Sequence, residues 1–202
     1  MSGADPRVAA IVLAAGQGTR FAAQADGEFK LLARLEGAPL VRHVVGMALD
    51  SRARPIIVVT GHRRDDVIDA LGGLAFEEAR NHAYASGLAS SLAAGLAALP
   101  ADVAGAIVLL GDMPRVSARL VDALIAAFVK RPDCDAVAPV HRGRRGNPVL
   151  LARSLFDAAE KLTGDEGARR LLTSADVVEM AVEDAGVTID VDTPASLHAL
   201  RG

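Results

Sequence analysis

A chain of 202 residues with 22 basic and 25 acidic side chains has a formal net charge of −3, so it presents no overall positive field for a polyanion. It holds five Phe, one Tyr and no Trp, which leaves few rings for stacking on bases, and we expect no nucleic-acid partner. Its apolar runs all fall short of the roughly 20 residues that cross a membrane as a helix, so we expect a soluble protein with no membrane association.

The length fits a single medium-sized domain. Neither an internal repeat nor a linker rich in Gly, Pro or Ser divides the chain, and we expect one domain over residues 1–202. The apolar run Val8–Ala15 has no basic region before it and leads directly into a glycine loop. It is therefore unlike a cleavable signal peptide, which favours a cytoplasmic protein. Cys134 is the sole cysteine and the five histidines are scattered, so we expect neither a disulfide nor a zinc site.

Short aliphatic runs alternate along the chain with segments of helical length. Helices are expected over 40–49 and 121–128, where apolar residues recur at helical spacing. Strands that are apolar on both faces, with amphipathic helices between them, predict an α/β fold. In this three-layer, Rossmann-like arrangement, helices cover both faces of a mostly parallel twisted sheet, and ligands bind beyond the carboxyl ends of the strands. The expected strands are 9–13, 55–60, 104–110, 136–140, 148–151, 177–182 and 187–191.

The first strand ends in the sequence VLAAGQGTRF, residues 12–21. Gly16 and Gly18 would expose backbone N–H groups at the strand end, where an anion such as a phosphate can approach closely. The pattern matches neither G-x-G-x-x-G nor a P-loop, and a plain turn is the alternative. Arg20 and Lys30 follow the loop and supply two cations of the kind that a triphosphate needs. A solvated charged face is the alternative for this pair.

Acidic residues follow two further apolar runs. Asp112 comes after the run 107–110 and is a natural Mg²⁺ ligand, because magnesium favours one or two carboxylates together with phosphate oxygens. A cap for the following turn is the alternative. Asp190 and Asp192 alternate with apolar residues, so both are expected to project from the same face of one strand. A helix capped by Thr193 is expected to begin directly after them.

Several stretches, in chain order, carry a resemblance to a known family: LAAGQGTR, LLGDMP, RRGNPVLL, LTGDEGARRLL and DVDTPASL. Together they resemble the nucleotidyltransferases with a glycosyltransferase-A-like fold, and more narrowly the molybdenum cofactor cytidylyltransferases. The stretch NHAYASGLASSLAAGL, residues 81–96, is similar to a segment of that branch. The resemblance implies a fold of the nucleotide-diphospho-sugar transferase type. It also implies that an acceptor phosphate attacks the α-phosphorus of a nucleoside triphosphate and pyrophosphate leaves, while the protein supplies position and charge neutralisation.

The resemblance implies roles for individual residues. Arg20, Lys30 and Asp112 would be catalytic, with the two cations acting on the triphosphate. Asp112 and Asp192 would hold Mg²⁺, with Asp190 as the substitute for Asp192. Ser90 could equally be an ordinary helix residue, and Arg145 part of an exposed basic loop. The residues implied in nucleotide binding are Leu13, Ala14, Ala15, Gly16, Gly18, Asn81, Ser86 and Gly87, and those implied in acceptor binding are Ser90, Arg145 and Asn147.

If Asp112 and Asp192 share one metal ion, the position and the stability effect of these two residues can also be predicted. Without it, the carboxylates of Asp112 and Asp192 are expected to repel each other, and with Mg²⁺ both would face the Gly16–Arg20 loop across one cavity. Asp112→Asn is then expected to leave the melting temperature of the metal-free protein unchanged, or to raise it.

The implied substrates are CTP or another nucleoside triphosphate and a molybdopterin-type acceptor, with a client molybdoenzyme as a further partner. CTP is favoured by Ala15, where the guanylyl branch more often has Gly. Guanylyl transfer and transfer to a sugar or alcohol phosphate are the alternatives within this chemistry. The long stretch FAAQADGEF between Arg20 and Lys30, and Ala22 within it, depart from the family pattern. They keep open a non-catalytic protein that delivers cofactor to a molybdoenzyme. A dinucleotide-dependent oxidoreductase would need a different glycine pattern.

Overall fold

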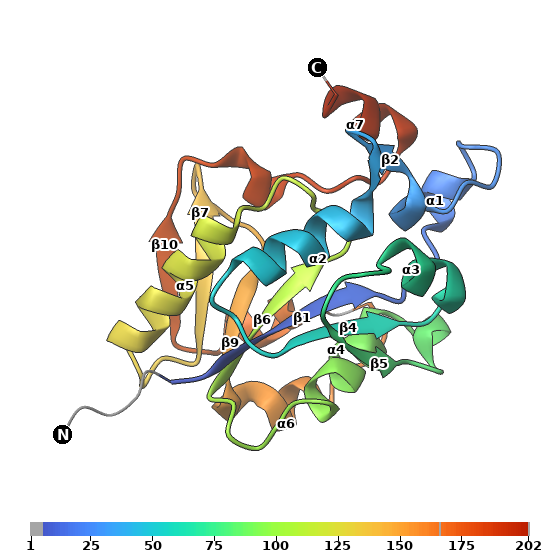
Figure 1. Ribbon diagram of the computed structural model, residues 1–202. Coiled ribbons are helices and arrows are strands. Elements are labelled where there is room, and N and C mark those ends of the chain that lie inside the picture. Colours follow the sequence, from blue (N-terminus) through green and yellow to red (C-terminus); the bar gives the residue numbers. More distant parts are fainter. Residues whose placement is uncertain (1–5, 166, 202) are drawn as a thin grey trace.

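The computed structural model describes residues 6–165 and 167–201 of the chain. Figure 1 shows a twisted central sheet with helices on both of its faces. The strands follow the order β10-β7-β9-β6-β1-β4-β5, and β8 pairs with β7 at one end. A separate two-stranded sheet is formed by β2 (Arg34–Leu35) and β3 (Ala38–Pro39). The strands of the main sheet are β1 (Val8–Ala14), β4 (Ile56–Thr60), β5 (Glu77–Arg80), β6 (Gly105–Leu110), β7 (Ala136–His141), β8 (Arg144–Arg145), β9 (Val149–Ala152) and β10 (Val177–Ala181).

Most neighbouring strands of this sheet are parallel. β1 lies between β4 and β6 and is parallel to both, β5 is parallel to β4, and β10 is parallel to β7. The exception in the main path is β9, which is antiparallel to β6 and to β7. The predicted α/β class with a mostly parallel sheet is confirmed. Because β1 and β6 are parallel neighbours, their carboxyl ends meet at one edge of the sheet.

The helices form two layers around the sheet (Figure 1). α2 (Leu40–Asp50) and α5 (Ala118–Lys130) pack on one face together with α3 (Arg64–Ala70), and α4 (Leu88–Ala97) and α6 (Phe156–Ala159) pack on the other. No helix within the described residues is long and apolar enough to cross a membrane. The remaining helical segments are α1 (Thr19–Ala22), α7 (Pro194–Ala199), η1 (Lys30–Leu32), η2 (Tyr84–Ser86), η3 (Arg153–Leu155), η4 (Ala168–Thr173) and η5 (Ala185–Thr188), where η marks a 3₁₀ turn.

Strand β1 supplies apolar side chains to both layers of the core. Ala10 and Val12 pack in the cluster under α2 and α5, whereas Ile11 and Leu13 pack in the cluster under α4 and α6. This alternation follows from the two-residue period of a strand. A strand buried on both faces is fixed in register, so the loop at its carboxyl end has a firm base.

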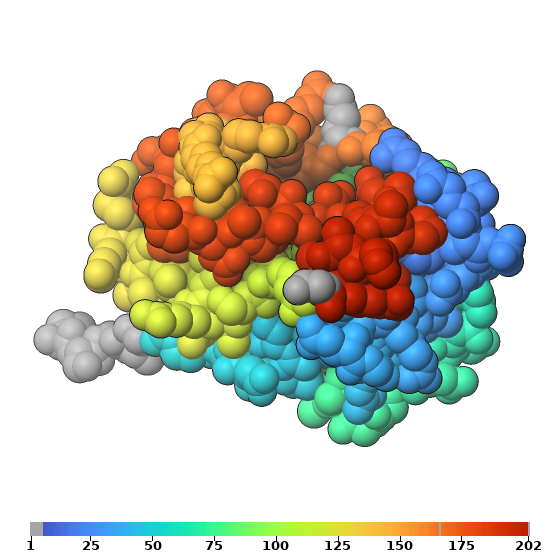
Figure 2. Space-filling view, turned by 90° about the horizontal axis from the view of Figure 1, so that it is seen from above, coloured from blue at the N-terminus to red at the C-terminus, as the bar shows by residue number. Residues whose placement is uncertain are grey.

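A smaller apolar cluster joins the two ends of the chain. Phe21 of α1 packs with Leu40, and the C-terminal residues Val191 and Leu197 complete the cluster. Figure 2 shows the C-terminal segment lying against the N-terminal loop region. α7 begins as predicted, because the Thr193 side chain accepts the Ser196 N–H in a capping box. The loop that carries Arg20 and Lys30 is therefore held against the C-terminal segment.

The strand predicted at 187–191 is wrong. Residues 185–188 form the turn η5, and the chain then crosses the sheet edge in irregular conformation. Backbone groups of this segment form hydrogen bonds with neighbouring loops instead of with a strand. Val187 C=O accepts the Asn147 N–H at 2.8 Å, and the Val191 N–H donates to Asp112 C=O at 3.0 Å. Val187 and Val191 are buried in different clusters, so their alternating apolarity does not mark one face of a strand.

Candidate active site

The loop after β1 is shaped by glycine. Gly18 has φ +61°, and a Cβ atom there would lie 3.0 Å from Lys30 Cβ. This left-handed conformation with a close neighbour strongly favours glycine. At the end of β6, a Cβ on Gly111 would lie 2.9 Å from the Leu13 carbonyl oxygen. The two strand ends therefore approach each other closely, and the stem of Lys30 runs beside the glycine loop.

A cavity of about 440 Å³ opens at these strand ends. Its walls come from the glycine loop, from η1, from the start of α4 and from the end of β6. Backbone N–H groups of a glycine loop, a lysine and a carboxylate in one cavity form a surface suited to a phosphorylated ligand with an associated cation. The residues that line the cavity include Leu13, Ala15, Gly16, Gln17, Gly18, Lys30, Tyr84, Gly87, Leu88, Ser91, Asp112 and Asp165.

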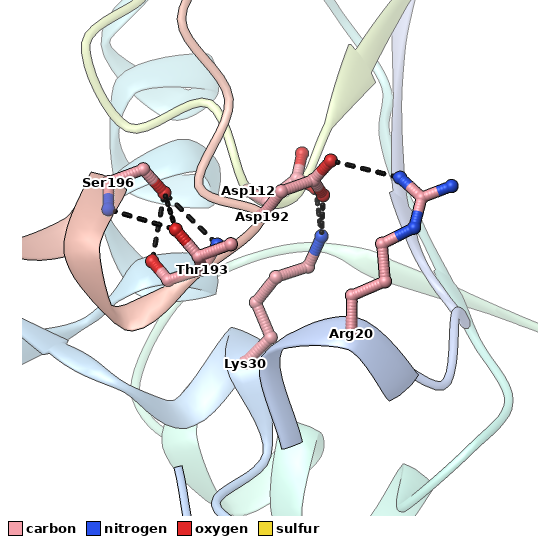
Figure 3. A network of polar contacts seen from close by, with 6 residues as sticks. All are labelled: Arg20, Lys30, Asp112, Asp192, Thr193 and Ser196. Atoms are coloured by element: carbon pink, nitrogen blue, oxygen red, sulfur yellow. Dashed lines mark hydrogen bonds and ion pairs between the residues drawn. The ribbon is translucent and has the colours of Figure 1, made fainter. Parts of the chain in front are cut away.

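Lys30 and Asp112 line this cavity, whereas Asp192 and Arg20 line neither this cavity nor its neighbour. Lys30 lies between the carboxylates of Asp112 and Asp192 (Figure 3). Its Nζ donates to Asp112 Oδ2 at 2.6 Å and to Asp192 Oδ1 at 3.1 Å. The side chains of Lys30 and Asp112 are 13% and 17% exposed, and that of Asp192 is 43% exposed. Arg20, which is 82% exposed, reaches Asp192 Oδ2 at 3.4 Å. Four predicted site residues from three parts of the chain thus form one cluster. The two carboxylates are not bare, as the prediction of repulsion assumed, because Lys30 bridges them.

The electrostatics of the cluster are dominated by burial and by this bridge. Burial lowers the pKa of Lys30, but the carboxylates of Asp112 and Asp192 outweigh it, so the pKa of Lys30 is raised. Burial raises the pKa of Asp112, and the Lys30 ammonium opposes this effect. Lys30 is therefore fully charged at neutral pH, and it stabilises the ionised form of a carboxyl group that burial alone would disfavour.

The cluster suits a hard divalent cation that also binds phosphate oxygens. Asp112 Oδ1 is buried and has no hydrogen-bond partner within the described residues. An orphaned carboxylate oxygen of this kind is costly unless a ligand satisfies it. Within residues 6–165 and 167–201, no group of three or more His, Cys, Asp and Glu side chains could hold a metal by itself. A metal here would take Asp112 and Asp192 from the protein and the rest of its oxygen ligands from substrate and water, which is the usual arrangement for Mg²⁺.

A second cavity of about 670 Å³ adjoins the first. The two share Leu13, Leu88, Leu110 and Asp165 in their walls. The second cavity has aliphatic side chains from β6, β9 and α4, while loop 143–147 and residues 167–173 close it from outside. Three arginines, Arg144, Arg145 and Arg169, are among its lining residues. An elongated ligand could extend from one cavity into the other.

Comparison with known proteins assigns this arrangement to a family. The profile of the MobA-like NTP transferase domain matches residues 10–180. The chain belongs to the MobA-like NTP transferase family. The matched residues include the glycine loop, Lys30 and Asp112, and they end before Asp190 and Asp192.

Three curated relatives of this MobA-like transferase illustrate the range of the family. The purine catabolism protein PucB of Bacillus subtilis is 30% identical in an alignment that covers 98% of this chain and 97% of PucB. The molybdenum cofactor cytidylyltransferase of Escherichia coli is 26% identical over 185 residues, which is 91% of this chain and 90% of the relative. The bifunctional protein GlmU of Clavibacter sepedonicus is 32% identical over 169 residues. The matched part is 81% of this chain but 31% of that GlmU, so the chain spans about a third of its length.

A solved structure shares the fold of this chain. Rv0371c from Mycobacterium tuberculosis H37Rv superimposes with a TM-score of 0.84 at 25% identity, over 98% of both chains. The shared fold therefore extends over almost the whole of this chain, including the C-terminal segment that the family profile does not reach.

The structure brings most of the predicted nucleotide-binding residues of this MobA-like transferase to the first cavity. Leu13, Ala15, Gly16, Gly18 and Gly87 line it. Ala14 is fully buried and lines neither cavity.

Asn81 is a buried residue that hydrogen-bonds two serines of α4. It is 5% exposed, and its Nδ2 donates to Ser90 Oγ at 2.9 Å and to Ser91 Oγ at 3.1 Å. The Ser86 hydroxyl donates to Ala83 C=O. Asn81 and Ser86 thus order the segment before α4, and neither lines a cavity.

The predicted acceptor residues divide in the same way. Arg145 and Asn147 line the second cavity. Arg145 is held in place, since its Nε donates to Glu179 Oε1 at 2.6 Å and its Nη1 donates to Leu172 C=O at 3.1 Å. Ser90 lines neither cavity, because its hydroxyl bonds the turn before its own helix, at Gly87 C=O and Ala83 C=O. Its neighbour Ser91 lines the first cavity instead.

Sequence reasoning missed several side chains at the first cavity, among them Tyr84 and Asp165. Tyr84 is placed by Gly61, where a Cβ atom would lie 2.7 Å from Tyr84 Cβ and 2.9 Å from Ala15 Cβ. Asp165 stands in the wall between the cavities, and its Oδ1 accepts the Leu88 N–H at 3.3 Å. Both residues lie within motifs that carried the resemblance, which was the available signal. The next residue of that motif, Glu166, lies outside the described residues.

Proposed function

We propose that this chain catalyses Mg²⁺-dependent nucleotidyl transfer, in which a nucleoside monophosphate moves from a nucleoside triphosphate, CTP in preference, to a phosphate-bearing acceptor of the molybdopterin type. Pyrophosphate is the second product. The observation that carries the proposal is that Lys30 and Asp112 line a cavity walled by a glycine loop, with Asp192 in contact with the same lysine. A second cavity that shares its walls gives the acceptor a place beside the nucleotide.

In this proposal, the first cavity binds the nucleoside triphosphate. The backbone N–H groups of Gly16 and Gly18 face its phosphates, and Lys30 neutralises the charge that develops on the leaving pyrophosphate. Arg20 is largely exposed, so it can reach the same phosphates from the solvent side. Preorganised charges of this kind are the main means of catalysis for transfer among phosphates.

The carboxylates of Asp112 and Asp192 would hold the metal ion. Mg²⁺, when bound, would supply charge neutralisation at the phosphate oxygens. The unpartnered Oδ1 of Asp112 supports this assignment. The protein itself offers no nucleophile in the mechanism, because the acceptor phosphate attacks the α-phosphorus directly.

The second cavity suits an acceptor with an apolar body and an anionic group. Leu92, Val108 and Val149 give it apolar walls, and Arg144 and Arg169 are exposed at its edge. The Escherichia coli relative, which matches over nine-tenths of both chains, is named for cytidylyl transfer to the molybdenum cofactor. Ala15, which lines the first cavity, supports CTP as the donor.

Pyrophosphate release tests the proposal. The protein is incubated with Mg²⁺, molybdopterin and each of the four common nucleoside triphosphates in turn, and release should be fastest with CTP. Lys30→Ala should lower turnover by about 10²–10³ fold, the usual cost of removing one group that stabilises transition-state charge. Lys130→Ala is the matched control, because Lys130 is exposed at the end of α5. Failure to release pyrophosphate with any triphosphate would refute the proposal and leave a binding or delivery protein.

A further inference from the structure

The cation position between Asp112 and Asp192 is filled by the protein's own lysine. Lys30 Nζ contacts one oxygen of each carboxylate, at 2.6 Å and 3.1 Å, and the close-up in Figure 3 shows both contacts converging on this one nitrogen. These carboxylates are also the metal ligands of the proposed function. A metal ion and the ammonium group therefore compete for the same negative charge.

The surroundings fit such a competition. Asp112 Oδ1 is buried and unpartnered within the described residues, so Lys30 satisfies only half of this carboxylate. Asp190 adds further negative charge near Asp112. The site thus keeps an unsatisfied oxygen that one ammonium group cannot serve but a divalent cation can.

The ammonium group of Lys30 can also take a second position, inside the first cavity. Its side chain lines the cavity of about 440 Å³ that the glycine loop also lines, and its stem passes 3.0 Å from the position that a Gly18 Cβ atom would occupy. Rotation about the side-chain bonds of Lys30 would carry Nζ from the carboxylates toward the phosphates of a bound triphosphate. Without such a ligand, the ion pairs of the Lys30 ammonium within the described residues are those with Asp112 and Asp192.

We propose that Lys30 is a resident counter-ion that yields its position between Asp112 and Asp192 to a divalent cation only when a nucleoside triphosphate offers the ammonium group new phosphate partners. This inference rests on the proposed function and adds an order of binding to it. The protein then binds metal weakly on its own and tightly with nucleotide. By linkage, metal strengthens nucleotide binding by the same factor.

Mn²⁺ binding to the full chain tests this inference directly, with free Mn²⁺ measured by electron paramagnetic resonance. In the absence of nucleotide, Lys30→Met should bind Mn²⁺ at least about tenfold more tightly than the wild type, within the usual range of coupling between sites. Methionine keeps an unbranched stem and removes the charge. Lys130→Met is the control and should match the wild type. Adding Asp112→Asn to Lys30→Met should abolish the gain, which would locate it at this carboxylate.

A second arm uses only the wild-type protein, so it does not depend on a variant that folds. CTP should tighten Mn²⁺ binding by about tenfold or more. Equal Mn²⁺ affinity of the wild type with and without CTP would overturn the inference. So would a folded Lys30→Met protein that binds Mn²⁺ no more tightly than the wild type without nucleotide. In either case, pyrophosphate release with CTP would leave the proposed function standing, whereas absence of both Mn²⁺ binding and pyrophosphate release would refute the two together.

Discussion

Lys30 is one of three lysines in the chain, and it is the one that the fold surrounds. Its side chain is 13% exposed, and its charge is balanced by Asp112 and Asp192 more than by water. Removing one partner of such a pair costs more than the pair contributes, because the remaining charge is left in a poorly solvated place. The stability of the metal-free protein should therefore depend on Asp112.

Asp112→Asn is predicted to lower the melting temperature of the metal-free protein, the opposite of what two bare carboxylates would give. Loss of a hydrogen bond between charged groups costs about 2 kcal/mol, which is roughly 4–8 °C for a chain of this size. Differential scanning calorimetry without metal or nucleotide measures the shift. Asp133→Asn is the matched control, since Asp133 is exposed and makes no hydrogen bond or ion pair within the described part of the chain, and it should shift the midpoint by less than about 2 °C. An unchanged or raised melting temperature for Asp112→Asn would show that the contact between Lys30 and Asp112 does not stabilise the metal-free protein.

At the scale of elements, the segment from η5 to α7 connects the parts of the site. Val187 C=O accepts the N–H of Asn147, in the loop at the second cavity, and the Val191 N–H donates to Asp112 C=O. Asp192 then contacts Lys30 and Arg20. One irregular segment thus contacts the acceptor-side loop, the end of β6 and the loop after β1.

Gly146→Ala is predicted to disturb acceptor binding and to spare nucleotide binding. A Cβ atom at Gly146 would lie 2.3 Å from the Val187 carbonyl oxygen, so the loop must move away from η5. A misplacement of about 1 Å can cost roughly 10² fold in rate. Steady-state kinetics should show a raised KM for the acceptor and a lowered kcat/KM, while the thermal shift on adding CTP stays at its wild-type size.

Gly73→Asn is the control for this substitution. Gly73 lines neither cavity and has φ +84° with open space around its Cβ position, and asparagine tolerates that backbone region better than other residues with a side chain. Wild-type kinetics are expected for it. Acceptor kinetics unaffected by Gly146→Ala would mean that the loop packing against η5 does not shape the second cavity.

At the scale of the whole molecule, the spacing of apolar residues along the chain predicted the layered fold, because this spacing indicates which residues are buried. β1, β4 and β6 are apolar on both faces, and α2 and α5 carry apolar residues at helical spacing, so the parallel sheet and its covering helices follow. The segment 187–191 alternates in the same way, yet its valines enter two different clusters. Alternation reports that residues are buried but not which surface buries them.

The sequence predicted which residues belong to the candidate site better than it predicted how these residues are arranged. Asp112 and Lys30 were recognisable from the strand ends and from the resemblance, but their direct contact spans 82 positions and no local pattern encodes it. Asn81 and Ser90 were placed near the ligand, whereas their side chains satisfy each other and the local backbone. A polar residue that orders a loop and one that faces a ligand look alike in a sequence.

The central claim is attack on the α-phosphorus of a nucleoside triphosphate, and the fate of a labelled phosphate tests it most directly. CTP radiolabelled at the α-phosphate, and in a parallel reaction at the γ-phosphate, is incubated with the protein, Mg²⁺ and molybdopterin, and the products are separated. The account predicts that the α label appears on the acceptor and the γ label appears in pyrophosphate. The γ label on the acceptor or in free inorganic phosphate, or both labels remaining in CTP, would contradict it.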